Sequence, residues 1–209
     1  MKWLIIATWS SPISGVKEAA KTLVKENGSA LDAVEIVARM EEDNPENCTA
    51  GFGGFPNRNG EVELDAAFMN GRDMSIGAVA AVKGYRNPVS IAKRLMTDSM
   101  HTFLVGQGAE DFAASKGFPR GILMTDGIRK AWEERAAELE KGQCEPIGHD
   151  TIGVVALDQS RNMAVATSTS GIGMKHRGRV SDTPLVGSGF YVDNDVGGAA
   201  ATGEVKPIV

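Results

Sequence analysis

Short apolar segments that are typical of β-strands alternate along this chain with longer segments that have a helical pattern, and glycines mark many of the joints. Such alternation packs as layers around one core, and 209 residues are enough for a single domain. The pattern therefore predicts a layered α/β domain without indicating a function. The predicted strands are 2–8, 61–68, 74–82, 102–105, 151–157 and 163–169, and the predicted helices are 14–26, 29–42, 87–96, 108–116 and 125–141.

Two of the predicted helices carry more specific signals. Ser29 is followed three residues later by Asp32, which resembles a capping box at the start of the second helix. In the helix over 125–141, Ile128, Trp132 and Leu139 form a narrow apolar stripe among charged residues. A stripe this thin predicts an exposed helix. From residue 187 onward the chain is rich in glycine and alanine, and no element is assigned there.

The charge and the apolar runs exclude several classes of partner. The formal net charge is −5, and basic and acidic residues are mixed along the chain. Because no Lys/Arg block supplies a phosphate-neutralising surface, neither nucleic acid nor an anionic membrane is expected as the main partner. The apolar run at 3–7 is too short to span a bilayer or to serve as a signal peptide. This favours a cytoplasmic location over a periplasmic or lysosomal one.

The two cysteines, Cys48 and Cys144, are distant in sequence and have no metal-like spacing. They are therefore interpreted as unpaired thiols, and they leave the redox compartment undecided.

Thr151 stands where a polar connector, residues 142–150, changes into an apolar strand. It has two interpretations. The plain one is a β-branched residue that starts a strand. The other is self-cleavage, in which its hydroxyl attacks the Asp150 carbonyl, the acyl group moves from nitrogen to oxygen, and water releases an N-terminal threonine. The new α-amine, with a reference pKa of about 7.7–8.0, can act as base for its own hydroxyl, so no histidine-based triad is needed.

Several short motifs occur in order along nearly the whole chain: Thr8-Trp9, Gly51–Gly54, Leu64–Ala66, Leu104–Gly106, His149–Gly153, Thr167–Gly171, His176–Asp182, Asp193-Asn194 and Ala200–Gly203. Together they resemble glycosylasparaginase, of the type 2 asparaginase family within the N-terminal nucleophile hydrolases. Each motif is weak alone, but their common order is specific. The resemblance implies a four-layer α-β-β-α sandwich of the α+β class. Residues 1–209 would form one domain, with 1–150 as the α chain and 151–209 as the start of the β chain.

The resemblance implies that Thr151 is the nucleophile and that Thr169 lies beside it. It also implies that Arg179 and Asp182 hold the α-carboxylate and α-amino groups of the substrate, which suits a guanidinium and a carboxylate. Plainer alternatives remain open at this point. Thr169 would instead cap backbone at a strand end, and Arg179 and Asp182 would form an ordinary surface ion pair. The charges at 175–177 are interpreted as loop charge.

The same resemblance makes Thr202 and Gly203 the oxyanion hole, through a hydroxyl and a backbone N–H. Trp9 would form an aromatic wall beside the substrate, and Thr49 would place a hydroxyl near the nucleophile. The alternatives are a helix start at Thr202 and a core position for Trp9. Asp150 would act as a base or as a strained carbonyl donor in self-cleavage.

The expected reaction is hydrolysis of N4-(β-N-acetylglucosaminyl)-L-asparagine through a β-aspartyl ester on Thr151, releasing L-aspartate. Plant-type asparaginases and isoaspartyl peptidases share most of these motifs, and remain the alternative. The segment 7–10 and the pair His149-Asp150 favour glycosylasparaginase. No metal or organic cofactor is needed, because protein groups supply nucleophile, base and oxyanion donors. The resemblance implies a small-molecule substrate and a homodimer of self-cleaved protomers.

The resemblance stops near Gly203, whereas chains of the family continue. Residues 204–209 are unlike the family, and Pro207 would break the helix expected there. The fold is therefore expected to be truncated at its C-terminal end. Three explanations stay open: a shortened gene product, a fragment completed by another chain, or a divergent scaffold protein that is uncleaved and inactive.

Overall fold

The fold is built on one large mixed sheet and a separate hairpin. The computed structural model describes residues 2–25, 27–98, 100–141 and 151–203. Neighbouring strands of the large sheet are antiparallel, except that β3 and β4 are parallel. In spatial order the large sheet contains β1 (Leu4–Ala7), β5 (Ile152–Leu157), β6 (Met163–Thr169), β2 (Leu64–Asn70), β3 (Ile76–Val82) and β4 (Phe103–Val105); the hairpin contains β7 (Phe190–Asp193) and β8 (Gly197–Ala200).

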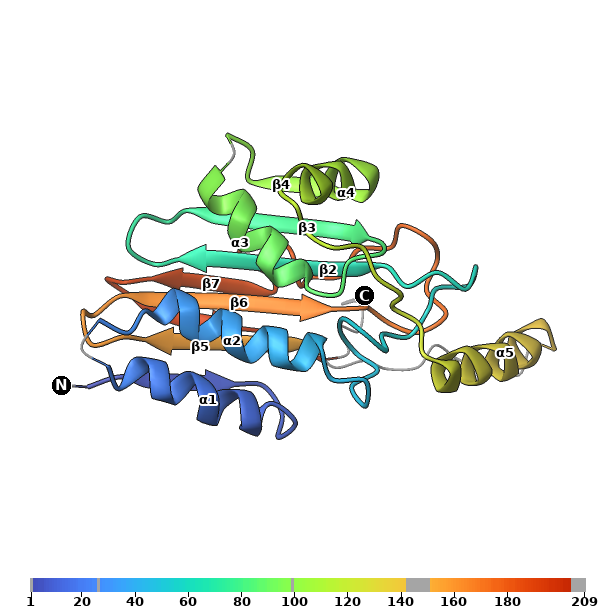
Figure 1. Cartoon of the computed structure of the whole chain (residues 1–209), viewed down its shortest axis with the longest axis horizontal. Helices are drawn as coiled ribbons and strands as arrows, with labels where there is room; N and C mark the ends of the chain where they lie inside the picture. Colours follow the sequence, from blue (N-terminus) through green and yellow to red (C-terminus); the bar gives the residue numbers. More distant parts are fainter. Residues whose placement is uncertain (1, 26, 99, 142–150, 204–209) are drawn as a thin grey trace, which may run out of the picture.

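Helices cover one face of the large sheet (Figure 1). The helices α1 (Ile13–Leu23), α2 (Ala30–Glu42) and α3 (Pro88–Asp98) lie over its strands, and α4 (Gly106–Ser115) lies beside β3 and β4. The helix α5 (Asp126–Glu140) projects from the body, and none of its residues is buried. Among the described helices, none has the length and apolar character needed to cross a membrane.

The hydrophobic core lies on both faces of the large sheet, because successive side chains of a strand point to opposite faces. On β2, Ala66 and Phe68 join the core beneath the helices, whereas Ala67 and Met69 pack with the hairpin residues Phe190 and Val192. The described residues thus form three layers, namely helices, large sheet and hairpin. This confirms a mixed fold with a large sheet and helices, while the fourth layer and the truncation stay predictions.

Most predicted elements occur within a few residues of their expected positions. Ser29 caps α2 as predicted, with its hydroxyl accepting a hydrogen bond from the Leu31 N–H at 3.1 Å. Asp32, the second member of the predicted capping box, forms an ion pair with Lys93 at 2.8 Å. The helix predicted over 125–141 is exposed, as expected. The β7–β8 hairpin was not predicted.

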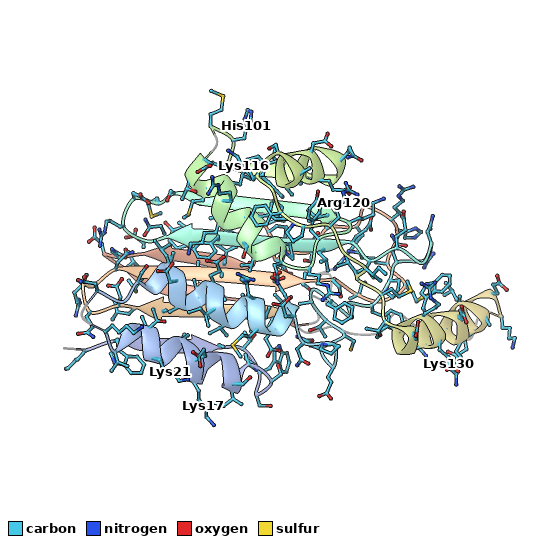
Figure 2. The ribbon with its side chains drawn as sticks, in the orientation of Figure 1. Lys17, Lys21, His101, Lys116, Arg120 and Lys130 are labelled. Atoms are coloured by element: carbon cyan, nitrogen blue, oxygen red, sulfur yellow. The ribbon has the colours of Figure 1, made fainter. Side chains whose placement is uncertain are left out.

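Basic side chains are distributed over separate edges of the molecule rather than gathered at one place. Figure 2 shows Lys17 and Lys21 at the edge formed by α1, Lys130 on α5, and Lys116 and Arg120 at the opposite side. Several of these cations have acidic partners: Lys21 pairs with Glu18, Lys116 with Asp98, and Arg120 with Glu110.

Candidate active site

Thr151 lies immediately before β5, and its backbone is held by Thr8, the residue that follows β1. The residue surface of Thr151 is only 6% exposed. The Thr8 hydroxyl, just beyond the end of β1, donates to the Thr151 carbonyl oxygen at 2.8 Å and accepts from the Gly153 N–H at 3.0 Å. The Thr8 N–H also donates to the Gly153 carbonyl at 2.9 Å. One threonine side chain therefore fixes the backbone on both sides of Ile152.

Two further hydroxyl groups meet the reactive atoms of Thr151. Thr151 Oγ1 lies 3.1 Å from Thr183 Oγ1, and the Thr151 N–H donates to Thr202 Oγ1 at 2.8 Å. Thr183 is fully buried, and its carbonyl accepts a hydrogen bond from the Thr167 hydroxyl at 2.8 Å. Because Thr202 accepts from the nitrogen, its own hydroxyl proton remains available for another acceptor.

Thr169 ends β6 on the neighbouring strand. Ile152 pairs with Ser168, so the same register continued by one residue places Thr169 opposite Thr151. The Thr169 hydroxyl nevertheless donates to the Thr49 carbonyl at 3.4 Å and accepts from the Gly171 N–H at 3.0 Å. It thus caps backbone, as the plain alternative predicts, while the contact with the Thr151 hydroxyl is made by Thr183. The catalytic role of Thr169 stays a prediction.

Arg179 and Asp182 lie on the segment that leads to Thr183. No ion pair joins them, although both residues are described, so the alternative of an ordinary surface ion pair is wrong. A Cβ atom added to Gly171 would lie 3.2 Å from Arg179 Nη1 and 3.2 Å from Lys175 Nζ. The absence of a side chain at Gly171, which has a φ of 74°, therefore lets two cationic groups approach the end of β6.

Lys175 corrects one interpretation of the sequence, because it is not a solvent-exposed loop charge. It is 3% exposed, and its ammonium donates to the Glu63 carbonyl oxygen at 3.1 Å. Burial lowers the pKa of Lys175, and the nearby Asp65 and Glu63 carboxylates oppose that shift. Nothing in the sequence indicated that Lys175 is buried. A buried lysine normally needs a carboxylate nearby, and the carboxylates of Glu63 and Asp65 are distant from Lys175 in the sequence.

A cavity of about 500 Å³ lies close to the start of β5. Trp9, with a φ of 64°, is 55% exposed, so the core alternative for this residue is wrong. Burial raises the pKa of Glu41 in the cavity wall, against hydrogen bonds from Ser11 and Asn47. The wall combines polar and apolar surface, and the cavity has a size suited to a small ligand. Its residues are Trp9, Ser10, Ser11, Glu41, Asn44, Glu46, Asn47, Cys48, Thr49 and Ile152.

Thr202 and Gly203 follow β8, and neither lies within a helix. The residues that would form a helix starting there, 204–209, lie outside the described residues, so that alternative stays open. Gly203 has a φ of 138°, a backbone conformation that favours glycine. Asp150 and His149 lie outside the described residues, as does Cys144, whereas Cys48 is an exposed free thiol. The bond proposed for self-cleavage is therefore described only from its Thr151 side.

Sequence reasoning missed two hydroxyl groups that contact Thr151. Thr8 was noted only as part of the Thr8-Trp9 motif, although it bonds the Thr151 carbonyl. Thr183 directly follows Asp182, so its neighbourhood was recognised but its contact with Thr151 Oγ1 was not. A threonine adjacent to a predicted substrate-binding residue is a signal that could have identified it.

These features define a layered α+β protein built around a buried threonine at the start of a central strand. A sequence profile described as asparaginase matches residues 6–209, and the chain belongs to this asparaginase family. The match confirms the resemblance found from the motifs.

Three relatives represent the range of names in the family. N(4)-(β-N-acetylglucosaminyl)-L-asparaginase of Elizabethkingia miricola is 42% identical over 212 residues, covering 100% of this chain and 61% of the relative. Isoaspartyl peptidase/L-asparaginase of Bos taurus is 46% identical over 192 residues, covering 90% of this chain and 62% of the relative. Plant-type L-asparaginase of Pyrococcus furiosus is 41% identical over 207 residues, covering 91% of this chain and 67% of the relative. The chain thus spans about three fifths of the length of the first two.

Proposed function

We propose that this chain is an amidohydrolase that cleaves the β-amide bond of an L-aspartyl group, with Thr151 as an N-terminal nucleophile. The observation that carries the proposal is the environment of Thr151. Its nitrogen and its hydroxyl oxygen each lie within hydrogen-bond distance of a threonine hydroxyl, at 2.8 Å and 3.1 Å, and Thr151 itself is only 6% exposed. A nucleophile that carries its own base needs its nitrogen and oxygen fixed in this way.

The first step is self-cleavage. The Thr151 hydroxyl attacks the carbonyl carbon of residue 150, the C–N bond breaks, and the acyl group is carried as an ester on Oγ1. The proton of the hydroxyl passes to the departing nitrogen, so the α-amine of Thr151 is already free at this stage. Water then hydrolyses the ester, which frees the Thr151 hydroxyl and leaves an α-carboxylate on Asp150. The Thr8 hydrogen bonds to Thr151 and Gly153 support this step, because they hold the attacking residue while its N-terminal neighbour departs.

In turnover, the free α-amine takes the hydroxyl proton as Oγ1 attacks the substrate amide carbon. The Thr202 hydroxyl and the Gly203 N–H stabilise the oxyanion, and the leaving amine takes the proton from the α-amine. Arg179 holds the α-carboxylate and Asp182 the α-ammonium group of the aspartyl moiety. Water, activated by the same amine, releases L-aspartate and restores Thr151. Thr169, on the neighbouring strand, is proposed to hydrogen-bond the reacting group with its hydroxyl, which would then exchange its bond to the Thr49 carbonyl for this one.

The proposal also specifies the group that leaves when the β-amide bond is cleaved. The cavity beside Ile152 is lined by Trp9, Asn44, Asn47 and Glu41, and its volume is about 500 Å³. Amide and carboxylate groups beside an aromatic ring suit a sugar, which favours N4-(β-N-acetylglucosaminyl)-L-asparagine. Isoaspartyl peptides or free asparagine are the alternative, because several relatives carry the name isoaspartyl peptidase/L-asparaginase. A homodimer of self-cleaved protomers is the proposed assembly.

A catalytically inactive scaffold that shares the fold is the rival from another class. One experiment separates the two. Cleavage before Thr151 divides the 209 residues into pieces of 150 and 59, which a denaturing gel and N-terminal sequencing identify. Aspartate release is then measured with glycosylated asparagine and with a β-aspartyl dipeptide.

The Thr151→Ala variant should abolish both cleavage and turnover, whereas Thr97→Ala, at an exposed site on α3, should preserve both. A stable single band together with no aspartate release from either substrate would refute the proposal and favour the scaffold.

A further inference from the structure

Asp65 on β2 is a fully buried carboxylate with no role in the proposed chemistry. Its Oδ1 accepts from the Ala81 N–H at 2.9 Å, and its Oδ2 accepts from the Ser181 N–H at 3.2 Å and the Ser181 hydroxyl at 3.3 Å. The β2–β3 register shifts between Leu64 and Ala66, opposite a residue, Ala81, whose φ is 52°. Such a bulge redirects a side chain from the regular ladder. Here Asp65 reaches the loop that carries the substrate-binding residues.

Hydrogen bonds connect this carboxylate to the proposed nucleophile. Ser181, held by Asp65, accepts from the Thr183 N–H through its hydroxyl at 3.3 Å. Thr183 in turn places its own hydroxyl 3.1 Å from Thr151 Oγ1. Ser181 also lies between Arg179 and Asp182 in the chain. The position of one serine therefore affects both proposed substrate contacts and the neighbour of the nucleophile.

A second carboxylate on the same segment holds the start of the loop. Both Glu63 oxygens accept from the Gly178 N–H, at 3.2 Å and 3.0 Å. The Lys175 ammonium, bonded to the Glu63 carbonyl, places a buried positive charge near Asp65. The loop is thus attached at two points, by Glu63, which directly precedes β2, at Gly178 and by Asp65 of β2 at Ser181. Burying the charges of Asp65 and Lys175 costs free energy of folding. This cost suggests that they have a role in holding the fold or in forming the site.

We propose that Asp65 is a positioning residue that holds Ser181 so that Arg179, Asp182 and Thr183 face Thr151. The proposal rests on the roles given above to Thr151, Arg179 and Asp182. It differs from a purely structural role in what it affects: loss of the Asp65 carboxylate should weaken recognition of the aspartyl group in addition to destabilising the fold.

Asp158 provides a matched control within the same chain. It is also a buried carboxylate, and it accepts three backbone N–H bonds, from Ala30 at 3.1 Å, Ser160 at 2.9 Å and Asn162 at 3.0 Å. It directly follows β5, whereas Thr151 directly precedes that strand. The two sites are therefore separated by roughly 20 Å, the length of the strand. Asp158→Asn should lower the melting temperature without changing the site.

The test compares wild type, Asp65→Asn, Ser181→Ala and Asp158→Asn. For each, KM and kcat for a β-aspartyl substrate, the Kd for L-aspartate and the melting temperature are measured. Asp65→Asn turns one acceptor into an N–H donor facing other donors, so KM and Kd should rise about tenfold to a hundredfold. Ser181→Ala should give a smaller rise, since its N–H bond to Asp65 remains. Asp158→Asn should leave KM and Kd within about twofold.

The proposal is overturned when Asp65→Asn lowers the melting temperature as Asp158→Asn does but leaves KM and Kd at wild-type values. If wild type itself neither turns over nor binds L-aspartate, the proposed function has failed, and a crystal structure of Asp65→Asn decides the positioning separately. Displacement of Ser181–Thr183 beyond about 0.5 Å supports the positioning, and an unchanged segment refutes it.

Discussion

Glu42, the last residue of α2, should make the stability of this fold depend on pH. The side chain is fully buried, and its Oε1 accepts from the Val89 N–H at 3.0 Å and from the Ser168 hydroxyl at 2.7 Å. Burial raises the pKa of Glu42 from 4.5 to about 8, against the lowering effect of these hydrogen bonds. At neutral pH the folded protein therefore keeps a proton on Glu42 that the unfolded chain has released.

The sign of the pH dependence follows from this difference. Between pH 4.5 and about 8 the folded state binds one more proton at Glu42 than the unfolded state, so stability falls as pH rises. The slope is about 1.4 kcal/mol per pH unit. Over the whole window the loss is on the order of 4–5 kcal/mol, which is comparable with the stability of an ordinary domain. The contribution is fully present below pH 4.5 and is lost above the folded pKa.

Glu42→Gln isolates this contribution, because the amide matches the neutral acid in shape and keeps an acceptor for Val89 and Ser168. The free energy of unfolding would be measured by urea denaturation at pH 5, 6, 7 and 8 for wild type, Glu42→Gln and the exposed control Glu46→Gln. Relative to wild type, Glu42→Gln should become more stable as pH rises, by several kcal/mol near pH 8, and Glu46→Gln should follow wild type. Parallel profiles for wild type and Glu42→Gln would refute the reasoning.

Three substitutions at the site have distinct expected outcomes. Thr183→Val removes the hydroxyl 3.1 Å from Thr151 Oγ1 while keeping its shape, so kcat for a β-aspartyl substrate should fall about tenfold to a hundredfold with little change in KM. Thr202→Val removes the proposed oxyanion donor and should lower kcat by about 10²–10³; a kcat within threefold of wild type would contradict that role. Gly153→Ala would place a Cβ 2.6 Å from Ala200 Cβ, so calorimetry should show a loss of about 1–3 kcal/mol of stability.

The regular elements were predictable because their signals are local. The strand over 163–169 was predicted at the bounds that β6 has, since an apolar segment and a following glycine mark its ends. The strand predicted from Glu61 begins at Leu64 instead. Asn57 explains the difference, because its side chain accepts from the Glu61 N–H at 3.1 Å and closes a turn where a strand ladder was expected.

Other features depend on contacts between distant segments, which a single sequence does not specify. The strand β8 was missed because glycine and alanine have low strand propensity. The strand β7 does carry a local signal, Phe190-Tyr191-Val192, but it was missed among the glycines and alanines that surround it. Close packing explains why residue 198 of β8 is a glycine, since a Cβ there would lie 2.7 Å from Val155 Cγ1 on β5. Asp65 was likewise missed as a partner of Ser181, because their bond spans 116 residues. The nucleophile and substrate contacts, in turn, were predicted through resemblance to a family rather than through local pattern.

The strand order of the large sheet has a consequence for the proposed cleavage before Thr151. The strands alternate in origin: β1 comes from the first 150 residues, β5 and β6 follow Thr151, and β2, β3 and β4 come again from the first part. The two products would therefore be interleaved, with β5–β6 bordered by the other product on both sides. Their separation would require two complete strand ladders to break. A nicked molecule should consequently migrate as one species under native conditions, and its cut would become visible only on denaturation.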